Sequence, residues 1–455
     1  MINNCSPEMI HEFSLDILED VGVRLEHDDI HAKLLRAGAK PGHGTYDVKL
    51  PRKMVQEYIR LAPPEVTLSS HAGASVVLTT DSPAIYWTNP GMYLWTGAAR
   101  RELTRADLAD VARLCDSLEN VQGIIGMAMH DVYPACRDFV GLRTIATHSR
   151  KHVRVLAFSP TGMDAVVEMQ RVFAGPWLSM GFTAHGPLRW TNLALEIFAH
   201  SAGHQIPATI NGEPMAGVTG PVTVAGSAAI GNAEILAGIV VNQLLEPGRP
   251  LIYNLGLAHT FDMKHATAVT GGPENALFAA ISAAMGRFYA IPSASWVSTE
   301  SLFEDEQAAM EKMFGFHTHA ESRVGLIWGM GQLESELTMS LAQLVIDNEM
   351  INYARRYARG CHDDADAIPL DLIRSVGIAG NYLESEHTLD HYRSQLFEPA
   401  ILNRRAREAS SVPLCETAHR RVDDILATEA ETTMADDAFI ELQRIEEFYS
   451  RRMQG

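Results

Sequence analysis

Cysteine is scarce in this chain, which has five cysteines among 455 residues and no CxxC pair. A small, odd number of cysteines at this length argues against a disulfide scaffold and favours reduced thiols. The first residues also lack the basic region and apolar run of a secretory signal. We therefore expect a cytoplasmic protein.

Positive charge is also in short supply, because 37 Lys and Arg residues face 56 Asp and Glu residues, for a net charge of −19. Nucleic acids and anionic membranes are bound through basic surfaces, so we expect no partner of either kind. Uninterrupted apolar runs of membrane-spanning length are missing. The most apolar long window, residues 222–246, is interpreted as a core helix because it contains Asn232, Glu234, Asn242 and Gln243.

Several motifs with known chemistry are absent. The chain has no GxGxxG after its first strand, no GxSxG elbow, no Walker loop and no HExxH. These absences weigh against dinucleotide binding, a serine nucleophile, an ATPase and a zinc protease. Histidine is frequent, with three close pairs: His148/His152, His200/His204 and His317/His319. We interpret these as structural or solvated histidines and expect no metal site, since no acidic or Cys third ligand stands near the His200/His204 pair.

The chain does contain a regular alternation of short apolar strands and longer helices. The expected strands are residues 84–88, 123–129, 153–158, 177–183, 206–211, 250–255, 291–297 and 323–329. The expected helices are residues 104–117, 137–150, 162–174, 190–204, 226–245, 273–289, 304–319 and 336–356. Eight such units predict an α/β fold of the (β/α)8 TIM-barrel type, with an open doubly wound sheet as the alternative.

The barrel pattern occupies the middle of the chain. We predict an N-terminal helical and mixed extension over residues 1–80 and the barrel catalytic core over residues 81–359. Residues 360–455 are helical and rich in Arg and Glu, and we expect them to pack on the barrel or to form a contact in a homo-oligomer.

In a (β/α)8 barrel, the active site lies at the carboxyl ends of the strands. Polar residues follow several of the predicted strands there, among them Glu213, Asn254, His259, Gln332 and Glu334. Strand-end loops are often polar simply because they meet water, so each residue has this alternative explanation.

Aromatic residues make up only 7% of the chain, yet three tryptophans fall on predicted barrel strands. These are Trp87, Trp296 and Trp328. Aromatic faces can form a cage around a quaternary ammonium, worth roughly 0.5–2 kcal/mol per ring. Ordinary core packing is the alternative for at least half of the chain's aromatics.

Several segments together resemble one family. They are residues 17–23 (ILEDVGV), 103–108 (LTRADL), 214–217 (PMAG), 220–223 (GPVT) with 232–238 (NAEILAG), and 380–383 (GNYL) with 387–389 (HTL). On these residues the chain resembles the trimethylamine methyltransferase family over nearly its whole length. The resemblance implies a methyltransferase that passes a methyl group from a methylated amine to a corrinoid (cobalamin). The corrinoid would sit on a separate protein docked over the barrel mouth, because this chain has no cobalamin-binding DxHxxG segment.

The chain departs from the founding members, which carry pyrrolysine in the barrel. The matching region, residues 331–336 (GQLESE), contains only standard residues. The chain therefore resembles the non-pyrrolysine branch, whose substrates are quaternary amines such as glycine betaine. A quaternary ammonium needs no activation, so no acid, base or nucleophile is expected, and Gln332 and Glu334 would only position the substrate.

The resemblance also suggests binding roles. For the substrate we predict Trp87, Glu213, Asn254, Trp296, Trp328 and His387, with His387, Asn254 and Gln332 as candidate donors to a betaine carboxylate. Gly220 and His259 are predicted on the corrinoid side. Two alternatives stay open: a different methyl acceptor, such as a folate, or a sulfonium donor; and a betaine-binding protein without enzymatic activity.

Overall fold

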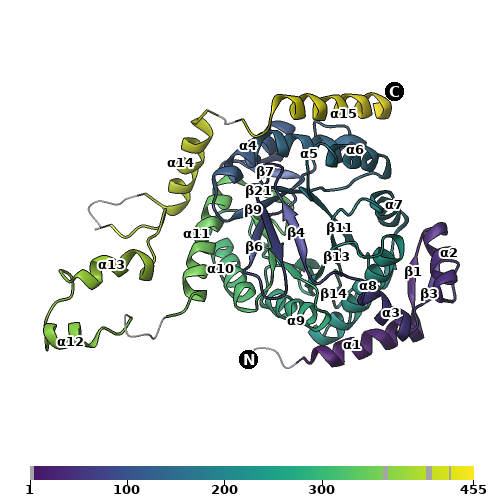
Figure 1. Ribbon diagram of the computed structural model, residues 1–455, viewed down its shortest axis with the longest axis horizontal. Helices are drawn as coiled ribbons and strands as arrows, with labels where there is room; N and C mark the ends of the chain where they lie inside the picture. Colours follow the sequence, from purple (N-terminus) through teal and green to yellow (C-terminus); the bar gives the residue numbers. More distant parts are fainter. Residues whose placement is uncertain (1–4, 362–366, 406–411, 430–431, 455) are drawn as a thin grey trace.

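The structure, a computed structural model, describes residues 5–361, 367–405, 412–429 and 432–454. Parts of the predicted segments 1–80 and 360–455 therefore lie outside the described residues. At the centre, eight parallel strands form a closed barrel in the order β10-β11-β13-β15-β18-β19-β6-β9 (Figure 1). The strands are β6 (Ile85–Thr88), β9 (Val121–Ile125), β10 (His152–Arg154), β11 (Leu178–Thr183), β13 (Ala208–Asn211), β15 (Leu251–Gly256), β18 (Ser293–Trp296) and β19 (Leu326–Met330). Closure through β19 and β6 confirms the barrel and removes the open-sheet alternative.

A ring of helices surrounds the barrel, as Figure 1 shows. They are α4 (Arg105–Ser117), α5 (Arg137–His148), α6 (Pro160–Gln170), α7 (Asn192–Ser201), α8 (Val224–Leu245), α9 (Pro273–Tyr289), α10 (Glu306–Glu321) and α11 (Leu341–Ala358). Their starts follow local chemistry: Thr104 and Asp107 form a capping box on α4, and Ser159 caps α6 ahead of a proline. All eight predicted helices are present.

Helix α11 begins later than predicted, at Leu341 instead of residue 336. Residues 334–336 have left-handed backbone, with φ of 55°, 50° and 78°, so they cannot belong to a right-handed helix. A short strand follows, and Ser340 then caps the helix through its side chain. The sequence pattern missed this because Glu and Ser carry no turn signal of the glycine kind.

Helix α8 is the predicted core helix. Its length and composition would suit a membrane span, but 78% of its most apolar window is buried inside the protein, which makes that weak evidence for a span. One polar side chain of the helix, Asn232, is hydrogen-bonded within the core. Asn232 contacts Ser14 at 2.9 Å, Tyr289 at 3.0 Å and Tyr253 at 2.8 Å.

The N-terminal part covers one side and one end of the barrel. It contains α1 (Pro7–Asp16), a π-helical turn (Ile17–Val21), α2 (Asp28–Ala37), α3 (Arg52–Ile59) and a small sheet of β1 (Val23–Leu25), β2 (Lys40–Pro41), β3 (Asp47–Lys49) and β12 (Arg189–Trp190). Helices α1 and α3 pack on α8. The hairpin β4 (Val66–Ser69) and β5 (Ser75–Leu78) packs against the strands from inside the amino-terminal end, so that end is closed.

The C-terminal part contains α12 (Leu370–Val376), α13 (Glu386–Gln395), α14 (Leu414–Ala427) and α15 (Asp436–Gln454). Helix α14 packs on α11 and α4, and α15 packs on α5 and α6. Helices α12 and α13 project from the barrel (left in Figure 1) and bury no side chain.

Two small sheets rim the carboxyl end of the barrel, which we call the mouth. One contains β14 (Met215–Ala216), β16 (His259–Asp262) and β17 (Thr267–Val269). The other contains β20 (Gln332–Leu333), β21 (Thr338–Ser340), β7 (Tyr93–Trp95) and β8 (Arg100–Glu102). The rim sheets follow β13, β15, β19 and β6 in the chain, and they place the loops that carry the candidate site.

Candidate active site

Three tryptophans meet inside the barrel. Trp87, Trp296 and Trp328 belong to one apolar cluster with the β4–β5 hairpin, and we call them the tryptophan layer. Trp87 stacks on His152 with ring centroids 5.3 Å apart and lies 6.5 Å from Trp328. The structure thus brings the predicted cage residues together, but they are at most 4% exposed. Their role in binding an ammonium stays a prediction.

His152 is part of the wall and not a metal ligand. Its ring contacts the Ser69 carbonyl at 2.9 Å and the Ser179 hydroxyl at 2.8 Å. Burial lowers the pKa of His152 to about 4, so the imidazole is neutral at neutral pH. It supports the Trp87 ring from below the mouth.

Arg154 ends β10 and points into the barrel above the tryptophan layer. Its guanidinium carbon lies 5.2 Å from the centre of the Trp328 ring, a cation–π contact. The side chain is 8% exposed, yet it makes no hydrogen bond or ion pair with any described residue. Burial lowers the pKa of Arg154 to about 10, and Glu336 opposes this effect, so the group stays charged at neutral pH.

A ring of neutral polar groups lies nearer the mouth. Thr183, Asn211 and Asn254 are paired across β11, β13 and β15. The Asn211 amide donates to Thr183 at 3.0 Å, and the Asn254 amide donates to Asn211 at 3.0 Å. Asn254 also accepts a hydrogen bond from the Gly256 N–H at 3.1 Å. These residues therefore form most of their hydrogen bonds with one another, which fixes the pocket wall.

Two carboxylates stand at the mouth, one from each rim loop. Glu213 follows β13, and Glu336 lies between β20 and β21; we call them the carboxylate pair. Both are partly exposed, and neither accepts a hydrogen bond from a described residue. Burial and the nearby charge of Glu336 raise the pKa of Glu213 to about 8, and burial raises the pKa of Glu336 to about 7. A cation between them would relieve their repulsion.

A third carboxylate, Glu234 on α8, lies behind Glu213. Burial raises its pKa to about 7, and one of its oxygens accepts the Leu188 N–H at 2.8 Å while the other has no partner. It adds negative potential at this side of the mouth, since it also helps to raise the pKa of Glu213.

The backbone that presents Glu336 is strained. Between residues 329 and 336, Gly329, Gly331 and residues 334–336 all have positive φ. Such conformations cost free energy in non-glycine residues and persist where surrounding contacts impose them. Here Lys312 donates to the carbonyls of Gly329 at 3.0 Å and Gln332 at 2.9 Å. The loop is therefore held in place from behind.

Gln332 and Glu334, the predicted positioning residues, take different places. The Gln332 amide donates to Ser298, and its carbonyl oxygen is buried without a partner, so it can still accept a hydrogen bond. Glu334 instead pairs with Arg100 at 2.6 Å and Thr338 at 2.5 Å on the rim sheet. Glu334 is thus paired within the rim sheet, and the partly exposed carboxylate at the mouth belongs to Glu336 instead.

The two residues predicted on the corrinoid side lie at the β14 rim sheet. His259 starts β16, is 6% exposed and uses Nδ1 for the Leu257 carbonyl at 3.0 Å; burial lowers its pKa. Gly220 precedes α8 and pairs with Ala216, and a side chain there would overlap Ser227. Both residues shape the rim, and their role toward a corrinoid stays a prediction.

His387 does not join the strand ends. It lies on α13, with its ring centre 4.4 Å from that of the His391 ring, in the part of the chain that projects from the barrel (Figure 1). The structure thus provides no place for it in the pocket formed by this chain.

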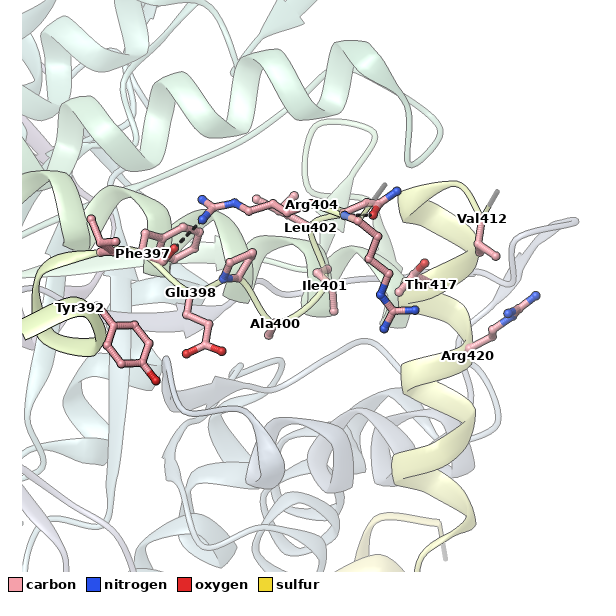
Figure 2. A pocket seen from close by; sticks show the side chains of 14 residues that line it. Tyr392, Phe397, Glu398, Ala400, Ile401, Leu402, Arg404, Val412, Thr417 and Arg420 are labelled. Atoms are coloured by element: carbon pink, nitrogen blue, oxygen red, sulfur yellow. Dashed lines mark hydrogen bonds between the residues drawn. The ribbon is translucent and has the colours of Figure 1, made fainter. Parts of the chain in front are cut away.

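One large hollow formed by described residues also lies in that C-terminal part. It has about 750 Å³ and is lined by side chains of residues 392–405 and of α14, including Tyr392, Phe397 and Arg420, as Figure 2 shows. No barrel strand contributes to its lining. We therefore keep the candidate site at the mouth, where the charged groups converge.

One group of described residues could hold a metal ion. Ligand atoms of Glu304, Cys415 and His419 lie within 4.8 Å of one another where α14 meets the barrel. Glu304 already accepts hydrogen bonds from Trp95 at 2.8 Å and Ser340 at 2.5 Å. Burial and Glu304 raise the pKa of Cys415 to about 11, which disfavours the thiolate that would bind a metal. We assign this cluster to packing of α14.

Two site residues were missed from the sequence alone. Arg154 lies within a predicted apolar strand, and a lone charge inside such a strand is the available signal. Glu336 lies at the start of a predicted helix, which gives no direction for its side chain.

Comparisons with known proteins identify the family of this chain. The family model described as trimethylamine methyltransferase (MTTB) matches residues 1–455. A trimethylamine methyltransferase of Desulfitobacterium hafniense is 29% identical over 88% of this chain and 83% of its own. A glycine betaine methyltransferase of the same species is 28% identical over 92% of this chain and 91% of its own. The crystal structure of the Methanosarcina barkeri monomethylamine methyltransferase has 12% identity and a TM-score of 0.55 over 98% of this chain and 86% of its own, which shows the shared fold. The chain is a methyltransferase and belongs to the trimethylamine methyltransferase family.

Proposed function

We propose that this enzyme moves a methyl group from a quaternary amine to the Co(I) corrinoid of a separate corrinoid protein. The observation that carries the proposal is the carboxylate pair, Glu213 and Glu336. Two carboxylates without hydrogen-bond donors, at the mouth of a barrel with tryptophans below, complement an organic cation. Names among the relatives include both trimethylamine and glycine betaine methyltransferases.

The chemistry asks little of the side chains. The methyl carbon bonds to cobalt as its bond to nitrogen breaks, and the bonding electron pair leaves on a neutral tertiary amine. The protein has only to hold the ammonium in line and keep water out. The neutral polar ring and the buried tryptophan layer suit that task, and the described mouth presents no nucleophile poised against a base.

The rim suits a docked methyl acceptor. Loops that follow the barrel strands expose large apolar side chains around the mouth: Met92, Val218, Val222, Met263, Leu302, Phe303 and Leu337. Exposed apolar side chains that gather at one end of a molecule are typical of a protein-binding surface. A corrinoid protein covering this rim would also exclude water from the pocket.

A methyl-transfer assay tests the proposal. The purified enzyme is mixed with cob(I)alamin and, in turn, glycine betaine, proline betaine, carnitine, choline, trimethylamine and dimethylsulfoniopropionate. Methylcobalamin from a quaternary amine supports the proposal. Transfer from the sulfonium compound alone would replace the proposed quaternary-amine donor. Transfer to a folate but not to cob(I)alamin would replace the proposed corrinoid acceptor. Betaine binding without transfer to any acceptor would indicate a binding protein.

We also propose a cytoplasmic homo-oligomer. Helices α12 and α13 bury no side chain and expose Ile373 and Leu389, and Ile378 and Leu383 between the two helices are exposed as well. A second copy of the chain would cover these apolar side chains. Light scattering after size-exclusion chromatography tests this; a monomer at micromolar concentration would contradict it.

A further inference from the structure

Arg154 carries a buried positive charge that has no hydrogen-bond or ion-pair partner among the described residues. Burying a guanidinium costs free energy unless hydrogen bonds and an opposite charge compensate it. No described residue forms a hydrogen bond or an ion pair with the side chain, and only the more distant charge of Glu336 offsets part of this cost. Its only close contact of note is the face of Trp328.

The surroundings are built to accommodate this side chain. Gly181 faces it from β11, and any Cβ there would overlap a guanidinium nitrogen of Arg154 and the Thr209 hydroxyl. A glycine at this strand position therefore makes the space that the guanidinium occupies. Neighbouring polar groups are taken: Thr183, Asn211 and Asn254 bond to one another.

We propose that Arg154 is the receptor for a carboxylate on the substrate, and so determines which quaternary amines the enzyme accepts. This inference rests on the proposed function and deepens it. A guanidinium presents parallel N–H groups that match the two oxygens of a carboxylate. A ligand that brings its own carboxylate would supply the missing partner.

The arrangement also sets the direction of the substrate. Along β13, Thr209 lies beside the guanidinium, Asn211 belongs to the polar ring, and Glu213 stands at the mouth. The carboxylate end of the substrate would therefore lie deep, on Arg154, and the ammonium end would lie outward, between Glu213 and Glu336. That orientation turns the methyl groups toward the rim, where the acceptor docks.

Binding of matched ligands tests the assignment. Glycine betaine and choline share the trimethylammonium group but differ in the carboxylate, and tetramethylammonium carries the cation alone. By calorimetry, Arg154→Gln should weaken glycine betaine binding about 100-fold, because a buried charged hydrogen bond is lost. The affinity of Arg154→Lys for glycine betaine should lie between those of the parent and Arg154→Gln, since lysine keeps the charge but not the paired N–H groups. Tetramethylammonium should bind Arg154→Gln equally or more tightly, because a repelling cation has been removed.

A stability measurement separates a binding role from a structural one. Arg154→Met should keep or raise Tm, because replacing an uncompensated buried charge by an apolar side chain relieves its cost. Arg249 is the matched control: it is also buried, but it donates to Ile206 at 2.8 Å and Ser201 at 3.1 Å and lies 3.7 Å from the Glu246 carboxylate. Arg249→Met should lower Tm by several degrees.

The outcomes are distinct from those of the proposed function. Unchanged glycine betaine affinity in Arg154→Gln, or an equal loss for glycine betaine and tetramethylammonium, overturns the receptor role even if methyl transfer is observed. If no amine supports methyl transfer but the charge-specific loss is seen, the receptor role stands and the proposed function falls. A Tm of Arg154→Met several degrees below the parent also overturns it.

Discussion

Two buried charged regions of this protein differ in whether their charges have hydrogen-bond and ion-pair partners. Behind the mouth, Lys312 and Asp347 form a fully buried ion pair at 2.6 Å. Lys312 also donates to two carbonyls, and Asp347 also accepts the Gly331 N–H at 2.7 Å and the Gln343 amide at 2.8 Å. Inside the mouth, Arg154, Glu213 and Glu336 have no hydrogen-bond or ion-pair partner among the described residues.

The difference separates support from function. A closed network such as Lys312–Asp347 rigidifies backbone, and here it holds the strained loop that carries Glu336. An open set of charges costs stability in the free protein and is relieved only by a ligand of complementary charge. Burial shifts pKa values in both regions. These shifts therefore mark a binding site only where hydrogen bonds and counter-charges are missing.

The largest effect should come from breaking the closed region. Asp347→Asn leaves the Lys312 ammonium buried without its counter-charge, which should lower the free energy of unfolding by about 3–5 kcal/mol. Urea denaturation measures this. Lys53→Met is the control, because the Lys53–Glu57 pair is exposed at 3.8 Å and should change stability by less than about 0.5 kcal/mol. Similar losses in both variants would contradict the distinction.

Removing the open charges should affect binding and its pH dependence. The ammonium needs ionised carboxylates, so affinity for tetramethylammonium should rise with pH as Glu213 and Glu336, with pKa values of about 8 and about 7, lose their protons. Glu213→Gln with Glu336→Gln should weaken binding at pH 9 by about tenfold or more and flatten the pH profile. A profile unchanged in the double variant would remove the pair from cation binding.

The same carboxylates should influence stability with the opposite trend. Their pKa values are raised in the folded state above the ordinary 4.5, so the folded protein keeps protons that the unfolded chain releases. The free energy of unfolding should therefore fall as pH rises from about 4.5 to about 8. Thermal unfolding across this range should show a smaller fall in the double Gln variant than in the parent; identical curves would contradict the pKa assignment.

The tryptophan layer should give a smaller, mixed effect. Trp296→Ala or Trp328→Ala should weaken ammonium binding by about tenfold through loss of an aromatic face. Both also leave a cavity in the core, so binding has to be measured below the lowered Tm. Trp87→Phe serves as a control because it keeps an aromatic face next to His152, and it should retain affinity. Unchanged affinity in both Ala variants would end the cage hypothesis.

The smallest effect is expected at His387. The helix that carries it projects from the barrel, so His387→Ala should leave glycine betaine and tetramethylammonium affinity unchanged in calorimetry. A selective loss for glycine betaine would restore the role predicted from the sequence and would place α13 at a mouth, through a neighbouring copy of the chain.

The barrel could be predicted from the sequence, because alternating strands and helices with clear caps are local signals. Glu213 and Asn254 could be placed near the mouth by the strand-end rule alone. Arg154 and Glu336 could not, since their direction depends on barrel closure and on the left-handed backbone of residues 334–336.

The most direct test of the central claim is proton release on cation binding. Calorimetry with tetramethylammonium at pH 7.5, in two buffers of different ionisation enthalpy, counts the protons exchanged. The open carboxylate pair predicts net release, because the cation favours the ionised forms of Glu213 and Glu336. Binding with no proton release, or with uptake, would contradict the claim that these two side chains receive the ammonium group.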